Sequence, residues 1–170
     1  PDHILQDDSI DCIVEVMGGT GLAKRVVETA LAGGKKVVTA NKALLAEHSA
    51  SIETIMKSTP SAQLAWEAAV CGGIPVIQLL QTAYPCSDSI ESVCGICNGT
   101  TNFMLTAMAK GSDYATVLKE AQDLGYAEAD PTADVEGFDV RAKIALLAML
   151  AFGGRVTSVE SIPCQGISKL

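Results

Sequence analysis

The chain has 170 residues, of which 48% are hydrophobic and 19% charged, a balance typical of a folded globular protein and not of a disordered one. Its formal net charge of −8 argues against nucleic acid and anionic membrane surfaces as partners, since phosphate binding needs clustered lysine and arginine. No apolar run reaches the roughly 18 residues that span a bilayer, so no membrane partner is expected. The polar start at Pro1 lacks both a signal-peptide pattern and an initiator methionine, so we expect the natural N-terminus to lie upstream.

Six cysteines are spread along the chain, and they do not form the dense framework of a small secreted protein: Cys12, Cys71, Cys86, Cys94, Cys97 and Cys164. Four of them fall in predicted strands or in the turns that follow, which favours reduced, buried thiols and a reducing compartment. The spacing of Cys94 and Cys97 resembles half of a zinc site, but no second pair accompanies it and four convergent ligands are required. We therefore expect no zinc there.

The first 70 residues alternate between strand-like and helical patterns. Strands are predicted at residues 11–17, 36–40 and 63–70, and helices at residues 22–31 and 42–58. Strands that alternate with helices through short connections are typical of a parallel sheet with right-handed crossovers. The G-x-G-x-x-G turn that opens a dinucleotide-binding sheet is absent, so we expect the phosphate-binding segment to precede Pro1.

The rest of the chain predicts helices around a polar, acidic loop at residues 126–136. Helices are expected at residues 76–84, 98–108, 116–124 and 140–152, and strands at residues 90–97 and 158–162. The fold class is therefore α/β, with a remnant of a parallel Rossmann-type nucleotide-binding sheet in residues 1–68. Residues 69–170 are expected to form most of an α/β substrate domain with its own sheet. Trp66 and the apolar stripe of the last helix are expected to be core.

Residues 124–143 contain the densest group of side chains that could carry chemistry. The acidic members are Glu128, Asp130, Asp134, Glu136 and Asp139, followed by Arg141 and Lys143. Asp139 and Lys143 are four residues apart and share a helix face, where a surface ion pair would contribute roughly 0.2–0.5 kcal/mol. Lys143, however, precedes the apolar run IALLAMLAF, so its ammonium is expected at a pocket edge, where it could act as a positioned acid beside carboxylates.

The segment LGYAEADPTADVEGFDVRAK, which starts at Leu124, closely resembles the signature segment of homoserine dehydrogenases. Other segments similar to that family follow in the same order along the chain: VEVMGGT from Val14, VVTANKALLAEH from Val37, EAAVCGGIP from Glu67 and GICNGTTNFML from Gly95. The resemblance implies an enzyme that interconverts L-homoserine and L-aspartate 4-semialdehyde with NADP or NAD, in the biosynthesis of threonine, methionine and isoleucine. It also implies a homodimer built on residues 69–170.

Roles for individual residues follow from the same resemblance. Lys143 matches the family's catalytic lysine, which would protonate the aldehyde oxygen as hydride arrives, or take the hydroxyl proton in the opposite direction. Glu128 and Asp139 match residues that hold the substrate through its ammonium group, and Asp134 matches a further acidic position of the site. Lys42, at the end of a predicted parallel strand where such sheets bind ligands, is expected to contact cofactor or substrate near the nicotinamide.

Further residues are expected to bind the cofactor or an ion. Gly18, Gly19 and Thr20 follow a strand end and would let the backbone approach the cofactor. Gly125 is a helix C-cap, and the resemblance adds a cofactor contact. The resemblance also implies a structural sodium-type ion, held by the side chain of Glu67 and by the carbonyl groups of Val70, Gly72 and Ile74. Without the resemblance, Glu67 would be interpreted as a strand carboxylate that accepts from backbone donors.

Two alternatives remain open from the sequence alone. One is a different NAD-dependent dehydrogenase of a small amino acid or semialdehyde, against which residues 128–143 argue. The other is a non-catalytic oligomerisation or regulatory piece. Because the chain lacks the G-x-G-x-x-G turn, we expect it to bind dinucleotide weakly and to show little activity by itself. A cytoplasmic location is expected, or a plastid in a photosynthetic eukaryote if a transit segment lies upstream.

Overall fold

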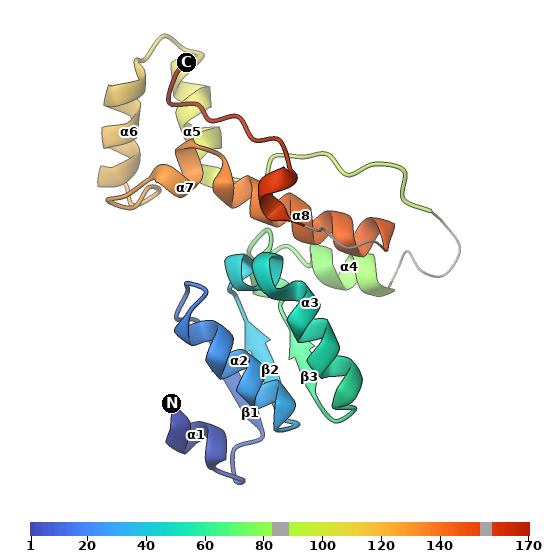
Figure 1. The fold of residues 1–170 in the computed structure, drawn as a ribbon. Helices are drawn as coiled ribbons and strands as arrows, with labels where there is room; N and C mark the ends of the chain where they lie inside the picture. Colours follow the sequence, from blue (N-terminus) through green and yellow to red (C-terminus); the bar gives the residue numbers. More distant parts are fainter. Residues whose placement is uncertain (83–88, 154–157) are drawn as a thin grey trace.

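A parallel sheet of three strands lies at one end of the computed structural model, which describes residues 1–82, 89–153 and 158–170 (Figure 1). The strands are β1 (Cys12–Glu15), β2 (Lys36–Thr39) and β3 (Gln63–Ala65), in the order β1-β2-β3. The connecting helices are α2 (Leu22–Ala32) and α3 (Lys42–Ser58). The alternation of strand and helix predicted from the sequence is therefore confirmed, and it gives the parallel sheet expected of a Rossmann-type domain.

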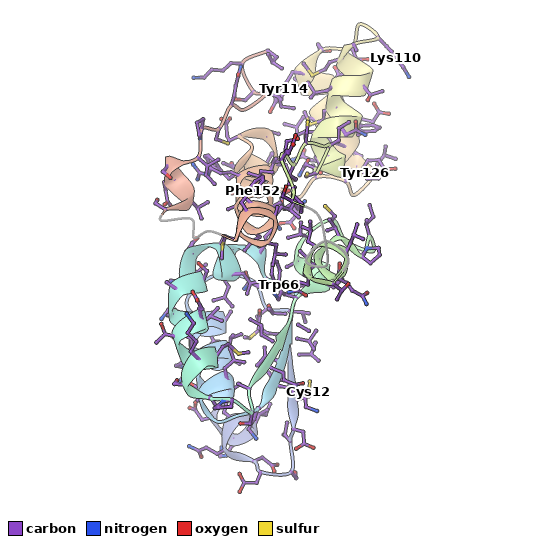
Figure 2. All side chains as sticks on the ribbon, turned by 90° about the vertical axis from the view of Figure 1, so that its right-hand side faces the viewer. Cys12, Trp66, Lys110, Tyr114, Tyr126 and Phe152 are labelled. Atoms are coloured by element: carbon purple, nitrogen blue, oxygen red, sulfur yellow. The ribbon has the colours of Figure 1, made fainter. Side chains whose placement is uncertain are left out.

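One face of this sheet is covered by α2 and α3, and the other is bare in the described part of the chain. Ile13 in β1 and Val37 in β2 point into the core, whereas Val14, the next residue of β1, is 66% exposed. This alternation follows from the two-residue period of a strand. Figure 2 shows Cys12 on the bare face, on the side of the sheet away from the helices.

Helices make up the rest of the described structure. They are the short α1 (Asp2–Gln6) at the start, then α4 (Val76–Thr82), α5 (Gly99–Met108), α6 (Tyr114–Asp123), α7 (Thr132–Val135) and α8 (Phe138–Phe152). The helices predicted at residues 98–108, 116–124 and 140–152 are confirmed, although α8 begins two residues earlier. The predicted helix end at residues 83–84, together with Cys86 and Gly154, lies outside the described residues. No helix in the described ranges is long and apolar enough to cross a bilayer.

Several strand predictions were wrong. Residues 90–97 have no regular secondary structure, and residues 158–162 contain the 3₁₀ turn η3 (Val159–Ser161). The third strand ends at Ala65, and the 3₁₀ turn η1 (Glu67–Ala69) follows it. A strand needs a neighbour to complete its hydrogen-bond ladder, and no described segment pairs with these residues. The second sheet expected in residues 69–170 is accordingly absent from the described part of that region.

Helix α8 links two hydrophobic cores. In the first core, the sheet, α2 and α3 pack with buried side chains of α8, including Leu146 and Leu147. Trp66 lies half-buried at the edge of this core, where the sheet meets the helices (Figure 2). The second, smaller core joins α5, α6 and α7 through Met104 and Val117. Because α7 leads into α8, the first turn of α8 lies between the two cores and is held from both sides.

We expect Leu146→Ala to lower the free energy of unfolding by about 2–5 kcal/mol, because this side chain is 2% exposed and its loss leaves a cavity in the first core. Urea unfolding followed by circular dichroism measures the change. Leu124→Ala is the matched control, since Leu124 is 56% exposed and its replacement should change stability by no more than about 0.5 kcal/mol. Equal effects of the two substitutions would show that α8 is not part of the core.

Candidate active site

A buried carboxylate joins the carboxyl ends of β1 and β2. Glu15 is buried, and its Oε2 accepts a hydrogen bond from Thr39 Oγ1 at 2.6 Å. Its Oε1 accepts from the backbone amides of Met17 and Gly18 at 2.8 and 3.2 Å. Glu15 therefore shapes the turn that follows β1. Sequence reasoning missed this role, because a single glutamate in a β-branched run gives no sign of the partners it finds on the next strand.

The turn after β1 presents open backbone at this edge of the sheet. Gly18 and Gly19 have φ of +76° and +71°, values that favour glycine, and no atom lies within 4 Å of the position that a Cβ would take at either residue. Asn41 holds the turn by donating from Nδ2 to the carbonyl of Gly19 at 2.7 Å, and its Oδ1 caps α3. Ligands of parallel sheets bind at the carboxyl ends of strands, and the predicted Gly18–Thr20 segment lies there.

Two lysines converge on one aspartate near the same edge. Asp139 Oδ1 lies 2.9 Å from the Nζ of Lys42, the first residue of α3, and Oδ2 lies 2.7 Å from the Nζ of Lys143. Asp139 is buried at 8% exposed and Lys143 is half-buried at 15%, so the interpretation as a surface ion pair is wrong. The first turn of α8 suits Asp139, because the helix dipole stabilises a negative charge there.

Asn98, the N-cap of α5, brings a second carboxylate to the group. Its Nδ2 donates to Asp134 Oδ1 at 2.7 Å and to Asp139 Oδ2 at 2.9 Å. The acidic loop and the start of α8 are therefore joined at one amide. From the sequence, Asn98 was expected only to begin a helix, since its partners are 36 and 41 residues away and no local pattern predicts them.

The surroundings of Asp139 favour its ionised form. Burial raises the pKa of Asp139, but hydrogen bonds from Lys143, Asn98 and Lys42 outweigh burial and hold this pKa below its ordinary value. Both ammonium groups pair with Asp139, and Asp134 is held by the amide of Asn98. The buried carboxylate of Asp139 is thus fully partnered.

A cavity of about 410 Å³ opens beside Lys143. Its walls include Asn98, Asn102, Gly72 and Ile74. The Nζ of Lys143 donates to the carbonyl of Cys97 at 2.7 Å as well as to Asp139, which leaves one of its three protons without a described partner. The prediction that this ammonium lies at a pocket edge is therefore confirmed.

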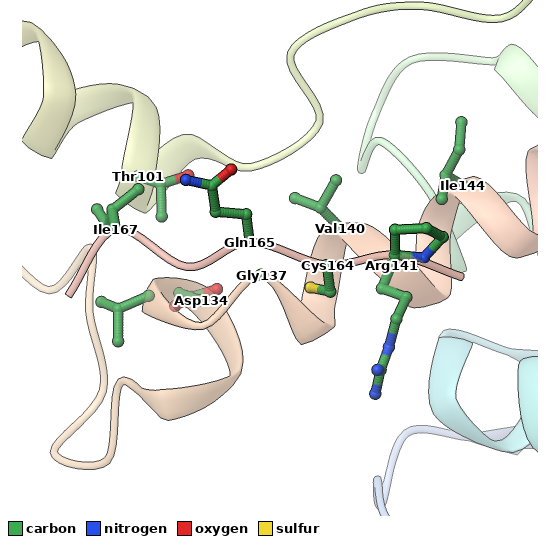
Figure 3. Close-up of a pocket in the computed structure, with 11 residues that line it drawn as sticks. Thr101, Asp134, Gly137, Val140, Arg141, Ile144, Cys164, Gln165 and Ile167 are labelled. Atoms are coloured by element: carbon green, nitrogen blue, oxygen red, sulfur yellow. The ribbon is translucent and has the colours of Figure 1, made fainter. Parts of the chain in front are cut away.

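A second cavity, of about 210 Å³, lies between the start of α8 and the C-terminal segment (Figure 3). Asp134 reaches its rim, and Gly137 and Cys164 form one side. Gly137 has φ of +79°, and a Cβ there would lie 2.9 Å from Cys164 Sγ, so glycine is needed where α8 begins. The C-terminal segment thus packs closely against the start of α8, where Cys164 Sγ also lies 3.1 Å from the carbonyl oxygen of Glu136.

Glu128 and Gly125 lie on the acidic loop at the end of α6. Glu128 is exposed, and its carboxylate has no described contact with Asp139 or Lys143, so the expected grouping of these residues is not seen. The loop is tied to α5 nearby, because Thr100 Oγ1 donates to the carbonyl of Tyr126 at 2.6 Å. The C-cap of α6 is Leu124 and not Gly125 as predicted, and Gly125 follows it with φ of +77°, the left-handed conformation that favours glycine after a helix end.

Glu67 lies on η1 and caps α4. Its two carboxylate oxygens accept from the amides of Ile77 and Gln78 at 2.9 and 2.8 Å. The strand position predicted for Glu67 was wrong, whereas the backbone donors expected from the residues alone are present. Val70, Gly72 and Ile74 follow in the turn that leads to α4, next to Cys71 at φ of +60°. The described ranges contain no group of three or more His, Cys, Asp or Glu side chains placed to hold a metal ion.

Comparison with known proteins covers almost the entire chain. Residues 2–67 match the family described as homoserine dehydrogenase, NAD binding domain, and residues 75–170 match the family described as homoserine dehydrogenase. The homoserine dehydrogenase of Corynebacterium glutamicum is 50% identical over 98% of this chain and 37% of its own length. A crystal structure of a homoserine dehydrogenase from Thiobacillus denitrificans superposes with a TM-score of 0.93 at 44% identity, over 99% of this chain and 38% of that one.

A second solved structure, of a putative homoserine dehydrogenase from Archaeoglobus fulgidus, has a TM-score of 0.87 at 35% identity, over 99% of this chain and 51% of that one. The chain thus spans less than two fifths of the Corynebacterium and Thiobacillus proteins, and about half of the Archaeoglobus one. The matches of sequence and of structure agree along the whole chain, and together they show that it belongs to the homoserine dehydrogenase family.

Proposed function

We propose that this chain is the substrate-handling part of an NAD(P)-dependent homoserine dehydrogenase. The complete protein would interconvert L-homoserine and L-aspartate 4-semialdehyde, in the biosynthesis of threonine, methionine and isoleucine. The chain spans 37% of the Corynebacterium glutamicum enzyme, so the activity is proposed for the complete protein and not for these residues alone. The observation that carries the proposal is the buried bridge of Asp139 between Lys42 and Lys143, beside an open cavity.

We assign residues 1–68 to the back half of the nucleotide-binding domain and residues 69–170 to the substrate and dimerisation domain. The three parallel strands and their crossover helices support the first assignment, and the cavity beside Lys143 supports the second. A homodimer built on residues 69–170 belongs to the same proposal. So does a cytoplasmic location, or a plastid in a photosynthetic eukaryote, and the free thiols of the five described cysteines are consistent with a reducing compartment.

The residues that would hold the cofactor, NADP or NAD, are Gly18, Gly19, Thr20, Lys42 and Gly125. The open backbone at Gly18 and Gly19 fits a group that must approach the main chain closely, and it lies at the carboxyl edge of a parallel sheet. When bound, the nicotinamide supplies the hydride transfer. The protein's own contribution is to orient the substrate and to manage one proton.

Lys143 would manage that proton. Asp139 and the carbonyl of Cys97 fix two of its three N–H bonds, and the remaining one can be directed to a substrate oxygen in the cavity. In the reductive direction Lys143 would give this proton to the aldehyde oxygen, and in the oxidative direction it would take the proton of the hydroxyl group. Asp139 holds the side chain in place in both states of the lysine.

Three carboxylates would recognise the ammonium group of the amino-acid substrate: Asp134, Asp139 and Glu128. Asp134 uses one oxygen for Asn98, and its other oxygen has no described partner, so it can accept from a ligand. Glu128 is exposed on the acidic loop, and we propose that it closes the site from that side. An ammonium ion among carboxylates forms charge-assisted hydrogen bonds, the strongest kind that this site offers.

We also propose a structural sodium ion held by Glu67 and the carbonyl oxygens of Val70, Gly72 and Ile74. Each oxygen of a carboxylate can accept more than one bond, so the contacts of Glu67 with α4 leave room for a cation. The turn that carries these carbonyls connects η1 to α4, next to the cavity of Lys143. The ion would stabilise the connection between the two domains.

Lys143→Met in the complete protein should lower kcat for homoserine oxidation by about 10²–10⁴, the usual contribution of a general acid or base. Steady-state kinetics with circular dichroism as a folding check measures this. Lys119→Met is the control, because Lys119 makes a similar i,i+4 pair on the exposed side of α6 and should keep its activity. Near-normal turnover by a folded Lys143→Met variant would overturn the assignment.

The stability of the site should depend on pH. The pKa of Asp139 is lower in the folded than in the unfolded chain, so its ionised form contributes stability above about pH 4, and this stability is lost as pH falls through the folded pKa. Asp139→Asn should cost roughly 3–5 kcal/mol at pH 7, since two ammonium groups lose their counter-ion. The difference in Tm between the two proteins should be largest at neutral pH and should shrink as pH falls below about 4. Asp123→Asn, in an exposed pair, should have little effect at any pH, and a constant difference for Asp139→Asn would contradict the prediction.

Replacing sodium and potassium with tetramethylammonium should lower Tm if the proposed ion is present, because this cation is too large for a cage of carbonyl oxygens. Glu67→Gln is the informative variant. Its amide oxygen can accept from only one of the two α4 amides, and it lacks the negative charge that would help to hold the cation, so its Tm should respond less to the exchange than that of the wild type. The same response in both proteins, or none in the wild type, would count against the site.

A further inference from the structure

We propose that Asn98 is the positioning residue of this site. Its side-chain amide holds Asp134 and Asp139 next to each other, and this fixes the positions of the two carboxylates relative to Lys143 and to the substrate. The role in catalysis rests on the proposed function, whereas the role in holding the two carboxylates does not. Asn98 would act through these neighbours and needs no contact with the reacting atoms.

Every hydrogen-bonding group of the Asn98 side chain is used. Nδ2 donates to Asp134 Oδ1 at 2.7 Å and to Asp139 Oδ2 at 2.9 Å, and Oδ1 accepts from the N and Oγ1 of Thr101 at 2.8 and 2.9 Å. An amide offers two donors and two acceptor positions, so no capacity remains. Its orientation is also determined, because a rotated amide would place its oxygen against two carboxylates. A buried, fully satisfied amide of this kind defines one geometry.

The main chain at the same point holds the lysine. The carbonyl of Cys97 accepts from Lys143 Nζ at 2.7 Å, and the next residue supplies the amide that binds the two carboxylates. Residues 97 and 98 therefore fix the ammonium and its counter-ion together. This connects the start of α5 to α8, two of the elements that border the cavity.

The helix cap by itself does not require asparagine here. Serine and aspartate cap helices about as well, and Asp113 makes the same pair of contacts at the start of α6, with the N and Oγ1 of Thr116. What asparagine adds is a pair of neutral donors for two like charges that lie within 2.9 Å of one nitrogen. Two carboxylates so close resist joint ionisation unless donors lie between them.

The charged groups around Asn98 come from several elements. Lys42 on α3 and Lys143 on α8 face Asp139, and Asp134 is on α7. The thiol of Cys97 is also near, but burial, followed by the neighbouring Cys71, raises its pKa, so it does not ionise under acidic conditions. Below neutral pH, Asp139 is thus the group whose ionised form the amide favours through its hydrogen bond.

Asn98→Ser and Asn98→Asp, with Asp113→Ser as the matched control, test the proposal in the complete protein. All three variants keep a helix cap, but the two Asn98 variants lose the amide donors. We expect kcat/KM for homoserine oxidation to fall about 10- to 100-fold in both, mainly through a higher KM, because the carboxylates that bind substrate lose their support. The acidic limb of the pH profile should move to higher pH, and further in Asn98→Asp, which adds a third carboxylate. Asp113→Ser should change neither.

The Tm of Asn98→Ser, measured from pH 7 to pH 3, tests the proposal independently of activity. Ionised carboxylates gain most from the amide, so the difference from the wild type should be largest at pH 7 and should shrink below about pH 4. A difference that stays constant with pH, together with an unmoved acidic limb, would leave Asn98 as a helix cap only and would overturn the proposal. A complete wild-type protein that does not oxidise homoserine would refute the proposed function, and the Tm comparison would still decide the role of Asn98.

Discussion

A single buried carboxylate, that of Asp139, dictates how the site is assembled. A charge that is 8% exposed must be paired, and Asp139 finds three donors, from Lys42, Lys143 and Asn98. These donors come from the first residue of α3, the second turn of α8 and the residue before α5. Three elements that are far apart in the sequence therefore meet at one side chain, and the cavity beside Lys143 follows from their meeting.

Local patterns predicted what depends on local structure. Helix α3 was expected at the residues where it lies, and the i,i+4 spacing of Asp139 and Lys143 placed both on one face of α8. The parallel sheet followed from short strands that alternate with helices. Such features arise from periodicities of a few residues, which a single sequence displays.

Features that depend on distant partners could not be predicted in this way. Residues 90–97 have the composition of a strand, but no described neighbour supplies a ladder, and composition carries no information about pairing. Asn98 and Glu15 are ordinary residues in their own segments, and their importance appears only when the partners on other elements are known. Glu67 was expected in a strand, yet β3 ends at Ala65 and the 3₁₀ turn η1 begins at Glu67. The carboxylate of Glu67 accepts hydrogen bonds from the amides of α4.

The boundary between the two hydrophobic cores does not coincide with the edge of the sheet. Helix α8 shares its core with α3, so Lys42 and Asp139 lie on helices of the same core, whereas Asn98 begins a helix of the smaller core. The contacts of residues 97 and 98 with Lys143 and Asp139 therefore cross from one core to the other. Any relative displacement of the two cores would break these two contacts together, while both lysines kept Asp139 as their counter-ion.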